Sequence, residues 1–130
     1  MKLYMSSTSG NAYKVRLLLE MLELPYEKVV LDFSKKEHKQ PAFMKLSPRG
    51  QVPVLEDGDK VLWGSTACLV YVARKHGGDQ WLPTDPAQMA EVMQWLELAQ
   101  NELHYGLQWA RGNKTGIRKV GDYDEYYGYG

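Results

Sequence analysis

Four consecutive hydroxyl side chains stand early in the chain, between a short apolar run and a helical pattern: Ser6, Ser7, Thr8 and Ser9. Ser9 is placed to cap a helix that begins near Asn11, and a helix N-terminus carries unpaired N–H groups and a partial positive charge that favour an anion. A thiolate bound there would have a lowered pKa, and a serine hydroxyl could donate a hydrogen bond that keeps the sulfur ionised. The alternative is a plain N-cap.

Two further polar groups could contact an acidic ligand. Gly64-Ser65 opens a second helical pattern, so Ser65 and the helix N-terminus could receive a carboxylate by the same argument, unless Ser65 is a simple cap. The run Glu37-His38-Lys39 places cationic side chains on a loop, where they could meet acidic groups, although such runs are usually solvated surface.

A proline stands at the mouth of a strand in the segment 47–55, Ser-Pro-Arg-Gly-Gln-Val-Pro-Val-Leu. Pro53 has no backbone N–H, and the Val52-Pro53 bond tolerates the cis form far better than other peptide bonds. Backbone polar groups at this point could turn outward and form a docking edge for a peptide-like ligand. The alternative is a trans proline at an ordinary strand start.

The apolar pattern supplies the elements that must position these residues. It first predicts a strand at 3–5, a helix with the stripe Val15, Leu18, Leu19 and Leu22 that ends before Pro25, and a strand at 26–31. A polar loop at 34–40 and a helical turn near 42–46 follow. The pattern then predicts a hairpin of strands 53–56 and 60–63, and a helix capped by Ser65 that ends at Gly77-Gly78. A β-α-β unit followed by a β-β-α unit gives a mixed sheet flanked by helices. The expected fold class is therefore α/β, with a thioredoxin-like arrangement over residues 1–78.

The remainder of the chain has a different pattern. Residues 79–86 hold two prolines and indicate a linker, and residues 87–111 form one long helical segment without proline. Two apolar stripes run along it, and a helix that is apolar on so much of its circumference is normally covered by several neighbours. Residues 112–130 are rich in glycine and tyrosine and favour an irregular conformation. We expect 87–130 to be the truncated start of an all-α domain.

Composition excludes several classes of function. Lys and Arg together number 16, as do Asp and Glu, so no basic excess favours nucleic acid as a partner. No apolar run approaches the roughly 20 residues that span a bilayer. Cys68 is the only cysteine, which rules out an internal disulfide and a multi-cysteine metal site. Within a helical pattern it is expected to be a small buried apolar residue rather than a redox nucleophile. The chain is expected to be soluble and cytoplasmic.

Taken together, the motifs strongly resemble the glutathione S-transferase family. The segments that carry the resemblance are 9–17, Ser-Gly-Asn-Ala-Tyr-Lys-Val-Arg-Leu, then 37–39, 47–55, and 63–67, Trp-Gly-Ser-Thr-Ala. The chain is most similar to the serine-dependent, bacterial theta-, phi- and zeta-like members. The likeness covers residues 1–78, and residues 87–111 resemble the first helix of the family's all-helical second domain.

The resemblance implies a glutathione site in the first domain, with glutathione as co-substrate and no metal. Val52-Pro53, with a cis bond, would lend backbone groups to the cysteinyl part, and Ser65 would receive the γ-glutamyl carboxylate. His38, Lys39 and Gln51 match positions near the glycyl end. Ser9 falls on the serine that stabilises the thiolate, although Ser6, Ser7 and Thr8 are close competitors. A homodimer and a small electrophilic second substrate are implied as well, with neither nucleic acid nor a membrane as partner.

Two departures from the family pattern bear on function. Gly64 stands where an acidic residue usually helps to hold the γ-glutamyl amino group, so we expect weaker affinity at that position of the glutathione site. The helical second domain, which supplies the electrophile pocket in the family, is represented by about one helix. The leading hypothesis is a glutathione transferase. The alternatives are a non-catalytic module that binds glutathione or a partner, and an inactive fragment of a longer transferase.

Overall fold

The computed structural model describes residues 1–116 of the chain, which fall into two compact units, Met1–Met89 and the residues from Ala90 on. The first unit contains the sheet and every candidate residue named above. The second consists of helix alone within the described residues.

A mixed four-stranded sheet forms the centre of the first unit, in the order β2-β1-β3-β4. The strands are β1 (Lys2–Met5), β2 (Glu27–Val30), β3 (Val54–Asp57) and β4 (Lys60–Trp63). β1 runs parallel to β2 and antiparallel to β3, and β4 pairs antiparallel with β3 around the turn that contains Gly58. The predicted thioredoxin-like order of strands is confirmed.

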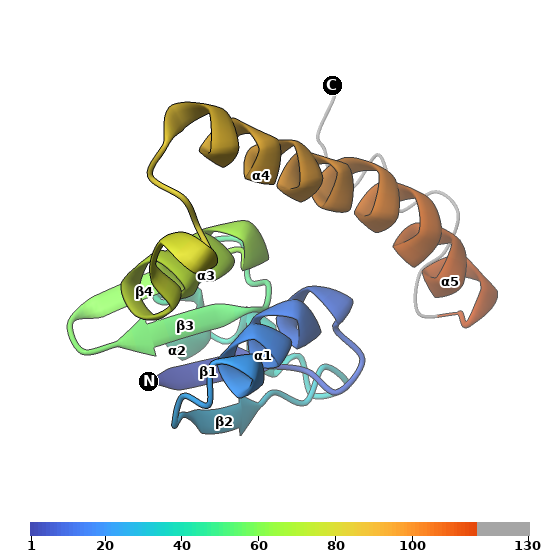
Figure 1. The fold of residues 1–130 in the computed structure, drawn as a ribbon. Coiled ribbons are helices and arrows are strands. Elements are labelled where there is room, and N and C mark those ends of the chain that lie inside the picture. The colour runs from blue at the N-terminus through green and yellow to red at the C-terminus, as the bar shows by residue number, and fades with distance from the viewer. Residues whose placement is uncertain (117–130) are drawn as a thin grey trace. The chain divides into compact units, whose positions relative to one another are not determined.

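Two helices cover one face of this sheet and a short helix lies on the other (Figure 1). α1 (Gly10–Met21) and α3 (Ser65–Val72) pack against each other, whereas α2 (Pro41–Met44) lies behind the sheet. Phe43 of α2 meets Tyr4 of β1 with ring centroids 5.7 Å apart, on the face opposite to Leu3 and Met5. The order of helices along the chain also agrees with the sequence prediction.

The core lies between the sheet and the α1–α3 layer. Its fully buried apolar side chains include Leu3, Val15, Leu19, Leu55 and Val72, whereas Val54, the register partner of Tyr4, is buried on the α2 face. The stripe predicted for the first helix accounts for two of these, and Leu18 is 7% exposed. Apolar burial of this kind is the main stabilising contribution to a fold of this size.

Cys68 is part of this core. Its side chain is fully buried, and the thiol donates to the carbonyl oxygen of Leu62 across 3.6 Å. Burial raises the pKa of the Cys68 thiol to about 12. The prediction of a small buried residue is confirmed, and a thiol with this pKa supplies almost no nucleophilic thiolate near neutrality.

Two local predictions in the first unit were wrong. Ser65 is the first residue of α3 and not its cap; Gly64 is the N-cap, with φ +90°, and provides no side-chain capping bond. Residues 37–39, predicted as part of a polar loop, form a 3-10 turn, η1 (Glu37–Lys39). The hydrophobic pattern does not predict either feature, because the cap of α3 depends on the backbone conformation of Gly64 and η1 depends on local hydrogen bonds.

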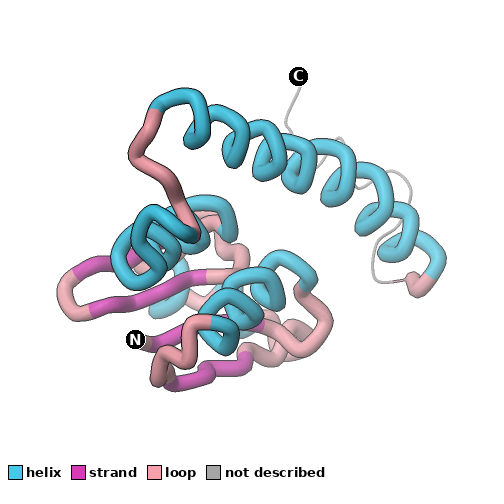
Figure 2. Tube along the Cα trace, viewed as in Figure 1, coloured by secondary structure: helices cyan, strands magenta, loops and turns pink. Residues whose placement is uncertain are grey.

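The second part of the chain is one continuous helical segment (Figure 2). It begins with α4 (Pro86–Leu98), continues through the wider π-helical turns of η4 (Ala99–Gln108) and ends with α5 (Trp109–Lys114). Asp85 accepts hydrogen bonds from the backbone N–H groups of Ala87 and Gln88, which fixes the start. The predicted long helix is confirmed. It extends to Lys114, so the prediction of irregular chain from 112 was wrong for 112–114, and the rest of that prediction falls largely on residues 117–130, outside the described part.

None of the helices in the described residues is long and apolar enough to cross a membrane.

A polar cluster outside the core ties the end of α3 to the β3–β4 hairpin. The Asp57 carboxylate accepts from Lys75 Nζ at 2.6 Å and from the Tyr71 hydroxyl at 2.9 Å. These donors, Lys75 first, lower the pKa of the Asp57 carboxyl below its usual range. The ionised carboxylate therefore stabilises the packing of α3 on the sheet.

This cluster gives the first prediction. Because the folded pKa of Asp57 is lowered, its contribution to the free energy of unfolding is present above the unfolded value of about 3.9 and is lost as pH falls through the folded value. Asp57→Asn should reduce stability at neutral pH and flatten the dependence on pH below about 4. Urea melts over a pH series measure both effects. Asp59→Asn, with a side chain 85% exposed, is the matched control and should melt like the wild type; equal profiles for both variants would contradict the assignment.

Candidate functional site

The sheet topology brings the candidate segments to one edge. β1 and β2 are parallel, so their carboxyl ends share an edge, and the antiparallel pairing of β3 with β1 places the start of β3 there as well. β4 runs antiparallel to β3 and ends at the same edge. The segments that follow β1, β2 and β4 and the one that precedes β3 therefore meet. These four segments contain every residue that the sequence predicted for the site.

Ser9 occupies the N-cap of α1. Its backbone is extended, with φ −79° and ψ 109°, and its Oγ accepts a hydrogen bond from the backbone N–H of Ala12 at 3.2 Å. A serine hydroxyl has one donor and two acceptor positions, so this capping bond leaves its proton available to donate. The cap and a contact to an anion are therefore compatible roles of one side chain.

The other three hydroxyl residues lie in different surroundings. Ser7 and Thr8 are exposed, whereas Ser6 is 4% exposed and its Oγ has no hydrogen-bond partner among the described residues. The Ser6 carbonyl accepts from the Ser9 N–H at 3.3 Å, which closes the turn ahead of α1. Only Ser9 combines partial exposure with the helix N-cap position.

The Val52-Pro53 peptide bond is cis, as the family resemblance implied. Pro53 is buried, and its carbonyl oxygen accepts from the backbone N–H of Gly64 at 3.2 Å. This bond continues the pairing of Val54 with Trp63 by one step beyond the strand. It sets the cis-proline segment beside Gly64 and the N-terminus of α3, where Ser65 is 3% exposed.

Ser47, which the sequence reading did not single out as a site residue, shapes the turn before the cis bond. It is 1% exposed; its hydroxyl donates to the Gln51 carbonyl at 2.9 Å and accepts from the Gln51 N–H at 3.2 Å. Gly50, with φ +57°, donates its N–H to the Ser47 carbonyl at 2.8 Å. The signal was present in the sequence, since Ser-Pro-x-Gly is a composition typical of turns with a hydroxyl anchor.

The turn around Ser47 contacts the segment that carries His38 and Lys39. Lys39 Nζ donates to the Arg49 carbonyl at 3.3 Å. A Cβ placed on Gly50 would come within 2.8 Å of the His38 carbonyl oxygen. The structure therefore brings His38, Lys39 and Gln51 into one neighbourhood, although they come from two separate segments.

His38 differs from the sequence expectation in its charge. Burial, and next the positive charge of Lys39, lower the pKa of the imidazole, so it is mainly neutral at pH 7 rather than cationic. The ring stacks on Phe33 with centroids 4.0 Å apart, and Nδ1 is buried without a partner among the described residues. An unpaired buried N–H costs more than an unpaired lone pair, which favours the proton on Nε2. His38 can thus donate a hydrogen bond from Nε2.

No group of three or more His, Cys, Asp or Glu side chains within the described residues could hold a metal ion. The chemistry available at this edge consists of two helix N-termini, a serine hydroxyl, a neutral imidazole, an ammonium group and peptide groups next to a cis-proline. Such a set binds an anionic, peptide-like molecule.

Comparison with known proteins gives a consistent result. Residues 1–74 match the family model described as glutathione S-transferase, N-terminal domain. The chain is 44% identical over 102 residues to a probable glutathione S-transferase GSTF2 of Oryza sativa subsp. japonica, covering 78% of this chain and 47% of the relative. The chain therefore spans about half the length of that relative.

Two solved structures have the same fold over most of this chain. A possible glutathione S-transferase from Rhodopseudomonas palustris superposes with a TM-score of 0.74 and 38% identity, covering 84% of this chain and 55% of the other. A glutathione transferase homolog from Drosophila mojavensis, with bound glutathione, gives a TM-score of 0.73 and 31% identity, covering 77% and 46%.

The turn at Gly50 gives the second prediction. Gly50→Ala should lower the free energy of unfolding by about 2–4 kcal/mol, because a side chain there is strained at positive φ and also meets the His38 carbonyl. Gly58→Ala is the matched control: its φ is +61°, but no atom lies within 4 Å of the added Cβ, so only the strain of about 1 kcal/mol applies. Denaturant melts measure the difference, and equal losses would show that the turn does not contact the His38 segment.

Proposed function

Because this chain belongs to the glutathione S-transferase family through its N-terminal domain, we propose that it binds glutathione and transfers its thiolate to a small electrophile. The observation that carries the proposal is the meeting of the cis Val52-Pro53 bond, the Ser9 cap and the Ser65 helix N-terminus at one edge of the sheet. Solved relatives hold glutathione or a glutathione derivative, which supports the same ligand here.

Each part of glutathione has a proposed partner. The peptide unit around its cysteine lies along Val52-Pro53, which precede β3 and are outside the regular ladder. The γ-glutamyl carboxylate meets Ser65, where the partial positive charge at the N-terminus of α3 favours negative charge. The glycyl carboxylate meets Lys39, with His38 donating from Nε2 and Gln51 from its side-chain amide.

Ser9 is the proposed catalytic residue. The thiol of bound glutathione gives its proton to solvent, and an electron pair of the sulfur forms a bond to the electrophilic carbon of the second substrate. At the same time that carbon's bond to a leaving group breaks and the group departs with the electron pair, or the π bond of an activated alkene opens and is then protonated from solvent. The Ser9 hydroxyl donates a hydrogen bond to the sulfur, and the partial positive charge at the N-terminus of α1 adds to the stabilisation of the thiolate. Cys68 does not compete as nucleophile, since its thiol is buried and its pKa is raised to about 12.

The wider organisation is part of the same proposal. Residues 1–78 form the glutathione-binding domain, 79–86 the linker, and the helix from 87 onward begins the helical domain that supplies the electrophile pocket in the family. We further propose a homodimer and a cytoplasmic setting.

Calorimetric titration with glutathione, paired with a conjugation assay on a standard electrophile, tests the proposal on one sample. Heat of binding together with turnover is the expected result. Binding without turnover would limit the function of this chain to glutathione recognition. No heat of binding would overturn the proposal.

The third prediction concerns Ser9. Ser9→Ala should raise the pKa of bound glutathione by one to two units, on the order of the loss of one hydrogen bond to a charged group, and lower kcat near neutrality at least tenfold. It should also reduce stability by about 1 kcal/mol through loss of the cap. Ser9→Asp separates the two roles, because aspartate caps the helix but repels the thiolate. Thiolate absorbance against pH measures the pKa, and an unchanged value in Ser9→Ala would remove Ser9 from the mechanism.

The fourth prediction concerns Gly64, where the family usually has an acidic residue. A side chain at φ +90° is strained by about 1–2 kcal/mol, but open space surrounds the position, since no atom lies within 4 Å of an added Cβ. Gly64→Asp and Gly64→Ala should share this strain, and aspartate, as the better N-cap, should lose about 1 kcal/mol less stability than alanine. Of the two, only Gly64→Asp supplies a carboxylate to the glutathione amino group, and it should bind roughly tenfold more tightly than Gly64→Ala. Equal affinities would show that the position does not face the γ-glutamyl group.

A further inference from the structure

The segment between β2 and α2, residues 31–40, carries His38 and Lys39 to the site edge. Its only regular element is η1, which has three residues and no buried side chain. A single 3-10 turn is poorly stabilised by its own hydrogen bonds, and core packing does not hold it here. The conformation of this segment must therefore depend on its remaining local contacts.

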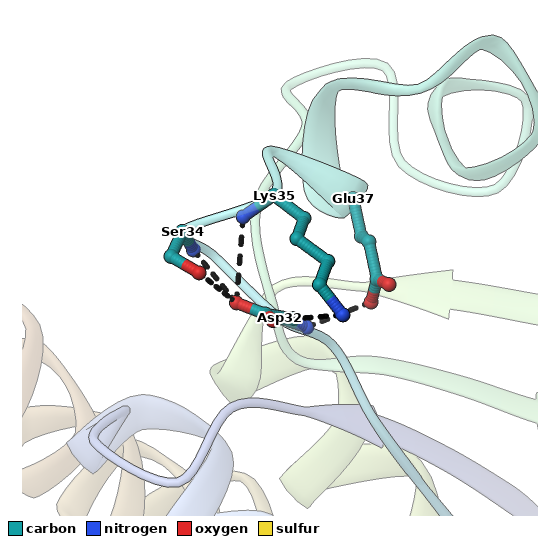
Figure 3. Close-up of polar contacts among 4 residues, drawn as sticks. All are labelled: Asp32, Ser34, Lys35 and Glu37. Carbon is teal, nitrogen blue, oxygen red and sulfur yellow. Dashed lines mark hydrogen bonds and ion pairs between the residues drawn. The ribbon is translucent and has the colours of Figure 1, made fainter.

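Glu37 closes the segment on itself (Figure 3). Its carboxylate Oε2 accepts from the backbone N–H of Asp32 at 2.7 Å, and its own N–H donates to the Asp32 carbonyl at 3.2 Å. Both backbone groups of Asp32 thus pair with one residue, five positions further along the chain. A charge-assisted bond of this length is among the stronger hydrogen bonds in proteins.

The Asp32 side chain fixes the first half of the same segment. Its Oδ1 accepts from the backbone N–H of Ser34 at 2.9 Å, from the Ser34 hydroxyl at 2.6 Å and from the N–H of Lys35 at 3.4 Å. The Lys35 ammonium lies 3.5 Å from Oδ2, with a side chain that is 74% exposed. An ion pair so exposed contributes little, so the backbone bonds hold the turn.

Two contacts of the site residues depend on this closure. Phe33 directly follows Asp32 and His38 directly follows Glu37, and their rings stack with centroids 4.0 Å apart. Lys39, two residues after Glu37, reaches the Arg49 carbonyl at 3.3 Å. Opening the pair would release both side chains from the site edge.

We propose that Glu37 is a positioning residue, whose carboxylate, through the Asp32 backbone, holds the His38 imidazole and the Lys39 ammonium where they meet the glycyl carboxylate of glutathione. The inference rests on the proposed function, since it takes glutathione as the ligand. A change at Glu37 should therefore alter the affinity for glutathione and not the reactivity of its sulfur, because Glu37 acts at the glycyl end and Ser9 at the thiol.

Glu37→Ala, Glu37→Gln and Lys35→Ala test the inference in the full chain. Glu37→Ala should raise both Kd and KM for glutathione about tenfold and leave kcat at saturation unchanged. Glu37→Gln keeps a carbonyl acceptor for the Asp32 N–H and should stay within about threefold of the wild type. Lys35→Ala removes only the exposed ion pair and should match the wild type. If Glu37→Ala melts below the assay temperature, Glu37→Leu, which fills a similar volume but offers no acceptor to the Asp32 N–H, replaces it.

A second readout does not need glutathione. Stacking on Phe33 shifts the imidazole proton resonances of His38, which His38→Asn assigns among the three histidines of the chain. Glu37→Ala should move these resonances toward the values of an unstacked histidine, and Glu37→Gln should not. Unchanged resonances, or changed resonances with unchanged Kd, would overturn the inference. If the wild type itself binds no glutathione, the proposed function fails, and the resonances alone decide whether Glu37 positions His38.

Discussion

The antiparallel pairing of β3 with β1 is the constraint on which the site depends. Leu3 and Leu55 are register partners, both fully buried, and they join the β-α-β half of the first unit to the β-β-α half. The direction of this pairing decides which chain ends meet. If β3 ran parallel to β1, the cis-proline would lie at the opposite edge from Ser9. The buried pairing at the centre of the sheet therefore brings a helix cap, a cis peptide bond and a second helix start to the same edge.

The sequence predicted most of this scaffold, because each element carries its own periodic signal. The stripe that includes Val15 and Leu19 identified α1, and Asp57-Gly58-Asp59 between two apolar runs identified the hairpin. The failures occur where no periodicity exists. The start of α3 depends on a glycine at φ +90°, and η1 depends on hydrogen bonds between Asp32 and Glu37. Such features follow from backbone conformation and from contacts that a hydrophobic pattern does not record.

The sequence predicted which residue types form the candidate site, but only in part their protonation and their hydrogen bonds. Motif resemblance located Ser9, Val52-Pro53 and Ser65, but it did not give the charge of His38. The imidazole is mainly neutral because its burial, and next the neighbouring charge of Lys39, lower its pKa. The anchoring role of Ser47 likewise requires the folded turn, because its hydroxyl bonds both backbone groups of Gln51. Local sequence supplies the groups, and tertiary contacts decide their protonation and direction.

The N-cap residues of α1 and α3 differ in whether the residue that starts the helix also offers a polar side chain at this edge. At α1 one residue does both, because Ser9 Oγ accepts from the Ala12 N–H through a lone pair, which leaves the hydroxyl proton available to donate. At α3 the N-cap residue only starts the helix. The backbone of residue 64 has a conformation that favours glycine, and glycine brings no carboxylate to the site. The cap of α3 therefore meets the requirement of the fold, and the groups left to attract an anion there are the Ser65 side chain and the partial positive charge of the helix N-terminus. The same glycine that lets the chain turn from β4 into α3 thus leaves the start of α3 without an acidic side chain.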